Sequence, residues 1–333
     1  MLKQAAVVYN PIKVTIDKLR ALVDAAAAEA GWAPPIWFAT TLDDAGQRVT
    51  ASAVRRGADV VLVAGGDGTV RAVAEGLRDT GVAMAVLPSG TGNLLARNLN
   101  LPLHMEDAVA VAFGGDDHQI DLGIATIERS DGDSEEHVFL VMAGLGIDAK
   151  MISNTRSDLK KAVGWLAYID GTIRSIPELK PIRLRYSLDD AAERSVNVHS
   201  VMVGNCGVLP GGILLIPGAR PDVGVLDIVA LRPQGAFGWL RVWNKIAWEN
   251  GVLRKSSLGR KIIDLTADVK DVTYLTGKDL RLRVDEPQEF QLDGDEFGEA
   301  TAVHAWVDAG ALTMRVPAVL RVEKHVVKEL AVS

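Results

Sequence analysis

Two glycine-rich stretches decide the fold: Gly65-Gly66-Asp67-Gly68-Thr69 and, twenty residues on, Pro88-Ser89-Gly90-Thr91-Gly92-Asn93. Each stretch follows a short apolar run that is typical of a buried strand, and each precedes a segment that is expected to be helical. Glycine permits positive φ angles, and without a Cβ atom its backbone N–H groups can approach an anion closely. Two such turns at one end of a parallel sheet predict a site for the phosphates of a nucleotide.

Asp67 is the charged residue of these two stretches, and its negative charge would repel a phosphate. A divalent cation between them removes the conflict, so we expect Asp67 to bind Mg²⁺ directly or through water. Gly-Asp-Gly also favours a tight turn, so a tight turn would explain one such stretch alone equally well. The second stretch favours the phosphate interpretation. Neither stretch is a Walker A sequence or a Gly-x-Gly-x-x-Gly fingerprint.

The two stretches supply most of the candidate nucleotide-binding residues. Thr69 can donate a hydrogen bond to phosphate or cap the helix that starts near it, and that helix adds a positive dipole end. The candidates in the two stretches are Gly65, Gly66, Asp67, Gly68, Thr69, Gly90, Thr91 and Asn93.

The first 115 residues alternate strand and helix patterns, which predicts a doubly wound parallel α/β domain with right-handed crossovers. The expected strands are 5–9, 36–39, 60–64 and 84–87. The expected helices pass through 19–30, 43–56, 69–78, 93–99 and 105–113.

Beyond residues 114–117 strand patterns dominate, and several alternate apolar and polar residues as half-buried antiparallel strands do. The expected strands are 119–124, 139–143, 182–186, 196–203, 226–231, 267–275, 280–284 and 302–307, with helices at 159–175 and 236–250 and an exposed hairpin tip at 130–136. We therefore predict a nucleotide-binding domain at 1–120 and a β-sandwich acceptor domain at 121–311. The tail, about 312–333, is expected to return to the first domain as a strand.

Composition excludes several classes of protein. The chain has 333 residues and a net charge of −7, which argues against a general nucleic-acid binder. The single Cys206 excludes an internal disulfide and a cysteine-cluster metal site. No apolar stretch is long enough for a spanning helix or resembles a signal peptide, so we expect a cytoplasmic protein.

Together these residues resemble the diacylglycerol kinase catalytic family, in its bacterial soluble lipid kinase branch, to which sphingosine kinases are related. Further matches run along nearly the whole chain: Asn10-Pro11, Pro88 through Arg97, Gly144 through Ala149, Asn205 with Gly211-Gly212, and Asp293-Gly294-Asp295. The resemblance implies a nucleotide domain like that of NAD kinases and phosphofructokinases, joined to a C-terminal β-sandwich.

The resemblance also implies an activity. ATP would be the phosphoryl donor, Mg²⁺ the cofactor and a lipid alcohol the acceptor, with diacylglycerol converted to phosphatidic acid. It adds Asn10, Pro11, Thr41 and Asp295 as nucleotide-binding residues and Asp293 as the general base. From the residues alone, Asp293-Gly294 would be an ordinary turn after a strand.

Three positions depart from the family's pattern. Ile12-Lys13-Val14 stands where a small or glycine-rich stretch usually follows Asn-Pro, and Arg71 stands where an asparagine is frequent. Val223 occupies the position of an aspartate that binds a structural Mg²⁺, which leaves Asp222 beside it as the candidate metal ligand.

The predicted helix at 236–250 is rich in tryptophan, which suits a bilayer interface but is also common where an amphipathic helix covers a core. A transient membrane contact at the inner face and a homodimer are both compatible with the sequence.

Two other functions stay open: an NAD kinase-like activity on a small molecule, and a catalytically weak nucleotide-binding regulator.

Overall fold

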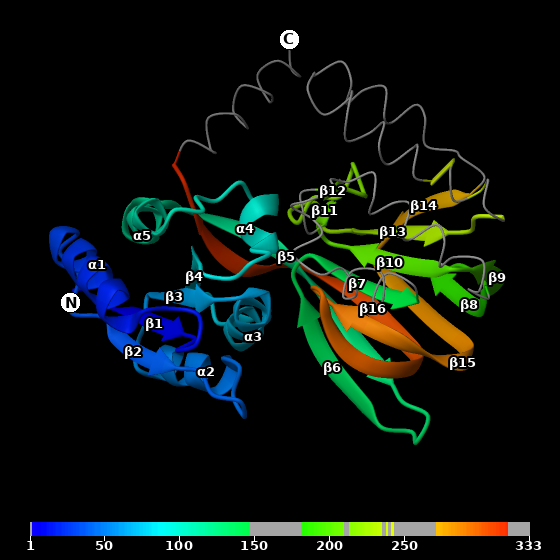
Figure 1. Cartoon of the computed structure of the whole chain (residues 1–333), viewed down its shortest axis with the longest axis horizontal. Coiled ribbons are helices and arrows are strands. Elements are labelled where there is room, and N and C mark those ends of the chain that lie inside the picture. The colour runs from blue at the N-terminus through cyan, green and yellow to red at the C-terminus, as the bar shows by residue number, and fades with distance from the viewer. Residues whose placement is uncertain are drawn as a thin grey trace, which may run out of the picture. The chain divides into compact units, whose positions relative to one another are not determined.

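The computed structural model describes residues 2–146, 181–209, 213–234, 238, 241–242 and 271–318 (Figure 1). The chain divides into two compact units, one formed by Met1–Asp121 with the stretch from Ala309, the other by Leu122–Asp308. The predicted helix at 159–175, most of that at 236–250, and the predicted motif residues Ile147–Ala149, Gly211 and Gly212 lie outside the described residues.

A parallel sheet forms the centre of the first unit. Its strands lie in the order β2-β1-β3-β4, and the C-terminal part of β16 (Asp295–Val316) continues it, with Met314 paired to Met84. The bounds are β1 Ala5–Tyr9, β2 Ile36–Ala39, β3 Val60–Gly65 and β4 Ala83–Pro88. Every residue of β3 and β4 is buried, which explains why these strands are apolar throughout.

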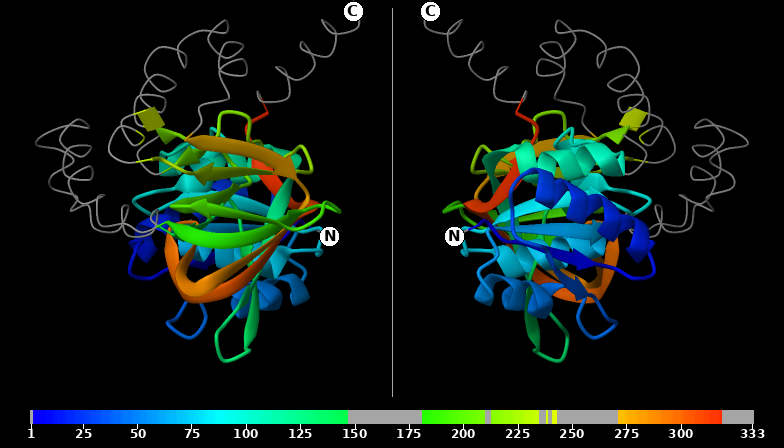
Figure 2. Two further views of the ribbon diagram at one scale, coloured as in Figure 1. Left: turned by 90° about the vertical axis from the view of Figure 1, so that its right-hand side faces the viewer. Right: turned by 90° about the vertical axis from the view of Figure 1, so that its left-hand side faces the viewer.

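Five helices of this unit cover the sheet on both faces: α1 Ile16–Glu29, α2 Gln47–Arg55, α3 Asp67–Leu77, α4 Leu94–Asn98 and α5 Met105–Gly114. Alternate residues of β1, β3 and β4 pack with α1 and α5 in one core cluster. The pair α2 and α3 lies on the opposite face (Figures 1 and 2). The predicted doubly wound arrangement is therefore present.

Helix α2 begins four residues later than predicted, because the side chain of Asp44 caps it from outside. The Asp44 carboxylate accepts hydrogen bonds from the N–H groups of Gly46, Arg48 and Val49, each at 3.1 Å. These donors would otherwise be unsatisfied at the start of the helix. The Asp44 side chain therefore marks the end of the loop that carries Thr41. The Thr41 N–H donates a hydrogen bond to the Asp44 carbonyl at 3.0 Å.

The second unit is built of antiparallel strands, in the order β14-β13-β10-β7-β15-β16, with β8 beside β15, β9 beside β8 and β6 beside β5. The bounds are β5 Asp116–Glu128, β6 Ser134–Phe139, β7 Met142–Gly146, β8 Ile182–Leu188, β9 Arg194–Val198, β10 Ser200–Gly204, β11 Val208–Leu209, β12 Ile213–Leu214, β13 Leu226–Leu231, β14 Val272–Gly277 and β15 Asp279–Leu292. Their inward residues, with Phe139 and Phe290 fully buried, form one core cluster.

Two predicted strands are each divided in the structure. The predicted strand 139–143 is interrupted at residues 140 and 141, where backbone N–H groups bond to a side chain instead of a neighbouring strand. The predicted strand 196–203 is divided at His199, which separates β9 from β10. Residues 130–136 are exposed, as predicted for a hairpin tip, although β6 already begins at Ser134.

Among the described residues, no helix has the length and apolar character needed to cross a bilayer.

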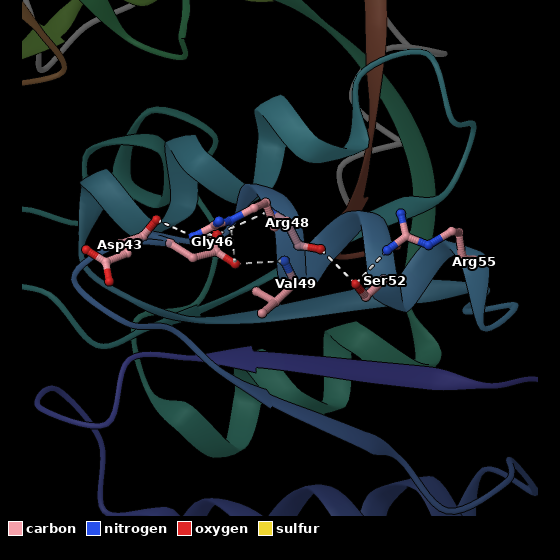
Figure 3. A network of polar contacts seen from close by, with 7 residues as sticks. Asp43, Gly46, Arg48, Val49, Ser52 and Arg55 are labelled. Carbon is pink, nitrogen blue, oxygen red and sulfur yellow. Dashed lines mark hydrogen bonds and ion pairs between the residues drawn. The ribbon is translucent and has the colours of Figure 1, made fainter.

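Replacing Asp44 by alanine should destabilise the first unit by about 1–2 kcal/mol, because three N–H groups at the start of α2 lose their acceptor. Urea unfolding followed by circular dichroism measures this change. Asp43→Ala is the matched control, since the contact that Asp43 makes in this network is through its backbone carbonyl (Figure 3). Equal midpoints for Asp44→Ala and wild type would contradict the capping role.

Candidate active site

The carboxyl ends of the four parallel strands carry the candidate residues of the first unit. Tyr9 is paired with both Ala39 and Ala64, and Gly65 is paired with Pro88. The loops that follow β1, β2, β3 and β4 therefore start at the same edge of the sheet, where ligands of open α/β sheets bind. The two glycine-rich stretches are the loops after β3 and β4.

The two glycine loops are in direct backbone contact. A Cβ atom added to Gly90 would lie 2.8 Å from the Cα atom of Gly66, which is closer than real side chains approach. A Cβ atom on Gly65 would lie 2.6 Å from the Thr69 Cβ atom. Glycine is therefore required at Gly65 and Gly90 by close approach between loops and helix.

Asp67 connects these loops. It is the first residue of α3, and its carboxylate accepts hydrogen bonds from the N–H groups of Asn93 at 3.0 Å and Leu94 at 2.6 Å. A Cβ atom on Gly92 would lie 2.6 Å from Asp67 Oδ2, so this glycine leaves room for the carboxylate. The sequence indicated Asp67 as a metal ligand but gave no sign of this second, structural role.

Asn93 closes the second loop from within. Its backbone has the left-handed φ of 47°. Its side-chain Oδ1 accepts the Gly90 N–H at 2.9 Å, and its Nδ2 donates to the Gly90 carbonyl at 3.0 Å. The amide that was predicted to contact nucleotide is thus bonded to Gly90. The N–H groups of Gly90, Asn93 and Leu94 all bond to side chains, while Thr91 is exposed at the tip of the loop.

The other candidates of the first unit lie at the same edge. Thr69 is buried under Gly65 in the first turn of α3. The Asn10 side chain accepts a hydrogen bond from the amide two residues further on, at 3.0 Å, and so shapes the loop after β1. Pro11 and Thr41 are exposed, and Gly66 and Gly68 are half-buried.

Asp293 occupies a two-residue turn between β15 and β16. Asp293 and Gly294 both have positive φ angles, 52° and 92°, as a tight hairpin requires. The side chain nevertheless points inward: Oδ2 accepts the Leu140 N–H at 2.9 Å, and Oδ1 accepts those of Val141 at 2.8 Å and Met142 at 2.9 Å. The residue is 6% exposed. Asp293, the predicted general base, is therefore both a turn residue with a positive φ angle and a buried carboxylate fixed by hydrogen bonds.

Two neighbours support the same segment. Asn205 is fully buried, and its Nδ2 donates to the Leu140 carbonyl at 3.0 Å. Burial raises the pKa of the Cys206 thiol, and the negative charges of Asp293 and Asp222 raise this pKa further. Cys206 is therefore a neutral buried thiol.

The predicted metal loop contains an ion pair. Arg220 Nη2 lies 3.0 Å from Asp222 Oδ1, and Val223 is 46% exposed. Within the part of the chain that the structure describes, no group of three or more His, Cys, Asp and Glu side chains could hold a metal ion. Asp295 is exposed and opens β16 opposite Leu292. The assignments of Asp222 and Asp295 stay predictions.

Comparison with known families decides the assignment of both units. The model of the diacylglycerol kinase catalytic domain matches residues 4–125, and that of the YegS C-terminal NAD kinase beta sandwich-like domain matches residues 141–322. The chain belongs to the diacylglycerol kinase catalytic-domain family. It is a phosphotransferase with an alcohol acceptor, and the predicted fold class, a parallel α/β domain followed by a β-sandwich, is confirmed.

Individual relatives agree with this membership. A probable lipid kinase YegS-like of Pseudomonas aeruginosa PAO1 is 35% identical over 227 residues, 67% of this chain and 71% of the relative. The diacylglycerol kinase of Mycobacterium tuberculosis H37Rv is 29% identical over 201 residues, 60% of this chain and 63% of that protein. A diacylglycerol kinase crystal structure from Bacillus anthracis Sterne covers 95% of this chain and 97% of its own with a TM-score of 0.63; at 18% identity it supports the fold alone.

Gly92→Ala should displace the Asp67 carboxylate, because the new methyl group would lie 2.6 Å from Oδ2, which is closer than real Cβ atoms approach. We expect amide hydrogen exchange at Asn93 and Leu94 to accelerate by at least about tenfold, as two charge-assisted hydrogen bonds are weakened. Gly114→Ala is the control, since a Cβ atom there meets nothing within 4 Å. Unchanged exchange at both amides would show that Asp67 does not hold the loop.

Proposed function

We propose that the chain is an ATP-dependent lipid kinase that transfers the γ-phosphoryl group to the hydroxyl of diacylglycerol and forms phosphatidic acid. The observation that carries the proposal is the pair of glycine loops held together by Asp67 at the carboxyl edge of the parallel sheet. Family membership and the names of the relatives support a lipid as the acceptor.

The donor site of this proposal lies in the first unit. The first turn of α3, an eleven-residue helix that starts at the loop, offers backbone donors and a positive dipole end to the phosphates. The remaining contacts are assigned to residues of the loops at the same edge, of which Gly65 and Thr69 are buried and the others are exposed or half-buried. The proposed set is Asn10, Pro11, Thr41, Gly65, Gly66, Gly68, Thr69, Gly90, Thr91 and Asn93. Asp295 is proposed as a nucleotide-binding residue from the family resemblance alone.

Mg²⁺ fits the donor set at Asp67. Mg²⁺ in kinases is usually bound by one or two carboxylates together with phosphate oxygens and water, so a dedicated cluster of protein ligands is not needed. Asp67 is half-buried, and its hydrogen bonds to Asn93 and Leu94 fix where its charge is presented. When bound, the ion neutralises charge on the transferring phosphate. A structural ion at Asp222 is proposed with less support, because Arg220 already pairs with that carboxylate.

Asp293 is proposed as the general base that accepts the proton of the lipid hydroxyl. Phosphoryl transfer passes through a loose transition state, in which alignment contributes more than strong basicity. A carboxylate held by the N–H groups of residues 140–142 is suited to alignment, because its position is fixed before the substrate arrives.

Access to a lipid acceptor also implies transient contact of this cytoplasmic enzyme with the inner face of a membrane.

A transfer assay with radiolabelled ATP tests the proposal. The acceptors are diacylglycerol, sphingosine and an isoprenoid alcohol in mixed micelles, and NAD in solution. We expect labelled phosphatidic acid, with the signal lost when EDTA removes Mg²⁺. Label on NAD alone would replace the proposal by an NAD kinase-like activity. Binding of ATP without label on any acceptor would favour a nucleotide-binding regulator.

Asp293→Asn should lower kcat by roughly 10²–10⁴, because it removes the proposed base, while the KM for ATP changes by no more than about twofold. Steady-state kinetics at saturating lipid separate these constants. Asn205→Ala is the matched control, because it loosens the same segment through Leu140 without touching the carboxylate. A comparable kcat loss in both variants would make Asp293 a structural residue only.

A further inference from the structure

The donor site proposed above lacks a cation from the protein. The two glycine loops contain no Lys or Arg, and their one charged residue, Asp67, adds a negative charge beside the phosphates. A nucleotide triphosphate carries more negative charge than one Mg²⁺ neutralises. Kinases and related enzymes place a Lys or Arg against the phosphates for this reason. The first unit should therefore present a positive side chain at the loops.

Two basic residues near the motifs are poorly placed. Arg71 belongs to α3, but it is only 8% exposed. Lys13 is exposed in the loop after β1, outside the two glycine loops. Arg97, one turn into α4, is exposed and is bonded directly to the second loop. Its hydrogen bond connects a basic side chain directly to the second glycine loop.

The hydrogen bond of Arg97 fixes the position of its guanidinium group without neutralising its charge, because the acceptor is a neutral carbonyl. Its Nε donates to the Gly92 carbonyl at 2.9 Å. Side chains on a helix lean toward its N-terminus, which returns this guanidinium to the loop that precedes α4. Guanidinium has five N–H donors, and Nε uses one of them. Among the described residues no carboxylate forms an ion pair with Arg97, and the residue is exposed, so its charge is not neutralised by the protein there.

We propose that Arg97 binds a phosphate of the donor nucleotide, with its guanidinium held in position by the Gly92 carbonyl. The assignment rests on the proposed function, since it requires ATP at these loops. The planar fork of Nη1 and Nη2 matches two phosphate oxygens, and its prior fixation reduces the side-chain entropy lost on binding. The end of the second loop is then bonded to two opposite charges: Asp67, bonded to Asn93 and Leu94, for Mg²⁺, and Arg97, bonded to Gly92, for phosphate.

The competing role is structural, in which Arg97 only stabilises the loop through Gly92. The two roles make different predictions for a conservative variant. Lysine keeps the charge but cannot reproduce the Nε contact together with a two-pronged phosphate contact. A phosphate contact predicts that Arg97→Lys retains part of the ATP affinity and that the loss in Arg97→Gln shrinks at high salt. A structural role predicts that both variants lose the same affinity at every salt concentration.

The experiment measures ATP binding by calorimetry in the presence of Mg²⁺ for wild type, Arg97→Gln, Arg97→Lys and the control Arg55→Gln. Arg55 is also a helical arginine with one side-chain hydrogen bond, to Ser52 at 2.8 Å, at the far end of α2 (Figure 3). We expect Arg97→Gln to bind ATP roughly tenfold to a hundredfold more weakly, Arg97→Lys to fall between it and wild type, and Arg55→Gln to stay within about twofold.

Amide hydrogen exchange of the ligand-free variants supplies the second readout. With a phosphate contact, exchange at Gly90, Asn93 and Leu94 in Arg97→Gln stays within about twofold of wild type. Weaker ATP binding with much faster exchange at these amides, and no recovery in Arg97→Lys, would overturn the phosphate contact. Unchanged ATP affinity in Arg97→Gln would overturn the Arg97 assignment alone. Failure of wild type to bind ATP would overturn the proposed function and the assignment with it.

Discussion

The hydrogen bonds from the backbone of Asn93 and Leu94 to the Asp67 carboxylate are the contacts on which the candidate site depends. They are charge-assisted, and each such bond contributes about 1.5–3 kcal/mol. They join the first residue of α3 to the first residue of α4, so neither loop can move without the other. The glycines follow from this: Gly92 leaves space for the carboxylate, and Gly90 leaves space for Gly66.

The second unit uses the same device at Asp293. There a carboxylate after a strand accepts the N–H groups of residues 140 and 141, which lie between β6 and β7, and that of Met142, the first residue of β7. Buried N–H groups without an acceptor would cost about 1–3 kcal/mol each, so the gap between the strands depends on this side chain. The carboxylates of Asp67 and Asp293 thus also stabilise the local fold. An electrostatic group held in this way needs little reorganisation when it acts.

Local patterns in the sequence predicted the helices and strands. The features that these patterns did not predict depend on side-chain contacts with other segments of the chain. The continuous apolar runs of β3 and β4 identified buried parallel strands, and the glycine loops after them were found by composition and spacing. The interruption at residues 140 and 141 was not foreseeable, because its cause, Asp293, lies about 150 residues away in the chain. The late start of α2 required knowing that the Asp44 side chain turns toward the helix. Residues 147–180, with a predicted helix and Asp148, lie outside the described residues.

The internal bonds of the second loop change how a glycine-rich turn is understood here. Such turns usually bind phosphate through backbone N–H groups. In this loop the N–H groups of Gly90, Asn93 and Leu94 are used by side chains of the protein itself. The loop can then contribute to phosphate binding mainly through side chains at its surface, the exposed Thr91 hydroxyl and the Arg97 guanidinium. Backbone donors would come instead from the loop after β3 and the first turn of α3. The two glycine motifs, alike in composition, would therefore act through different groups: the first through its backbone, the second through the side chains that its backbone holds in place.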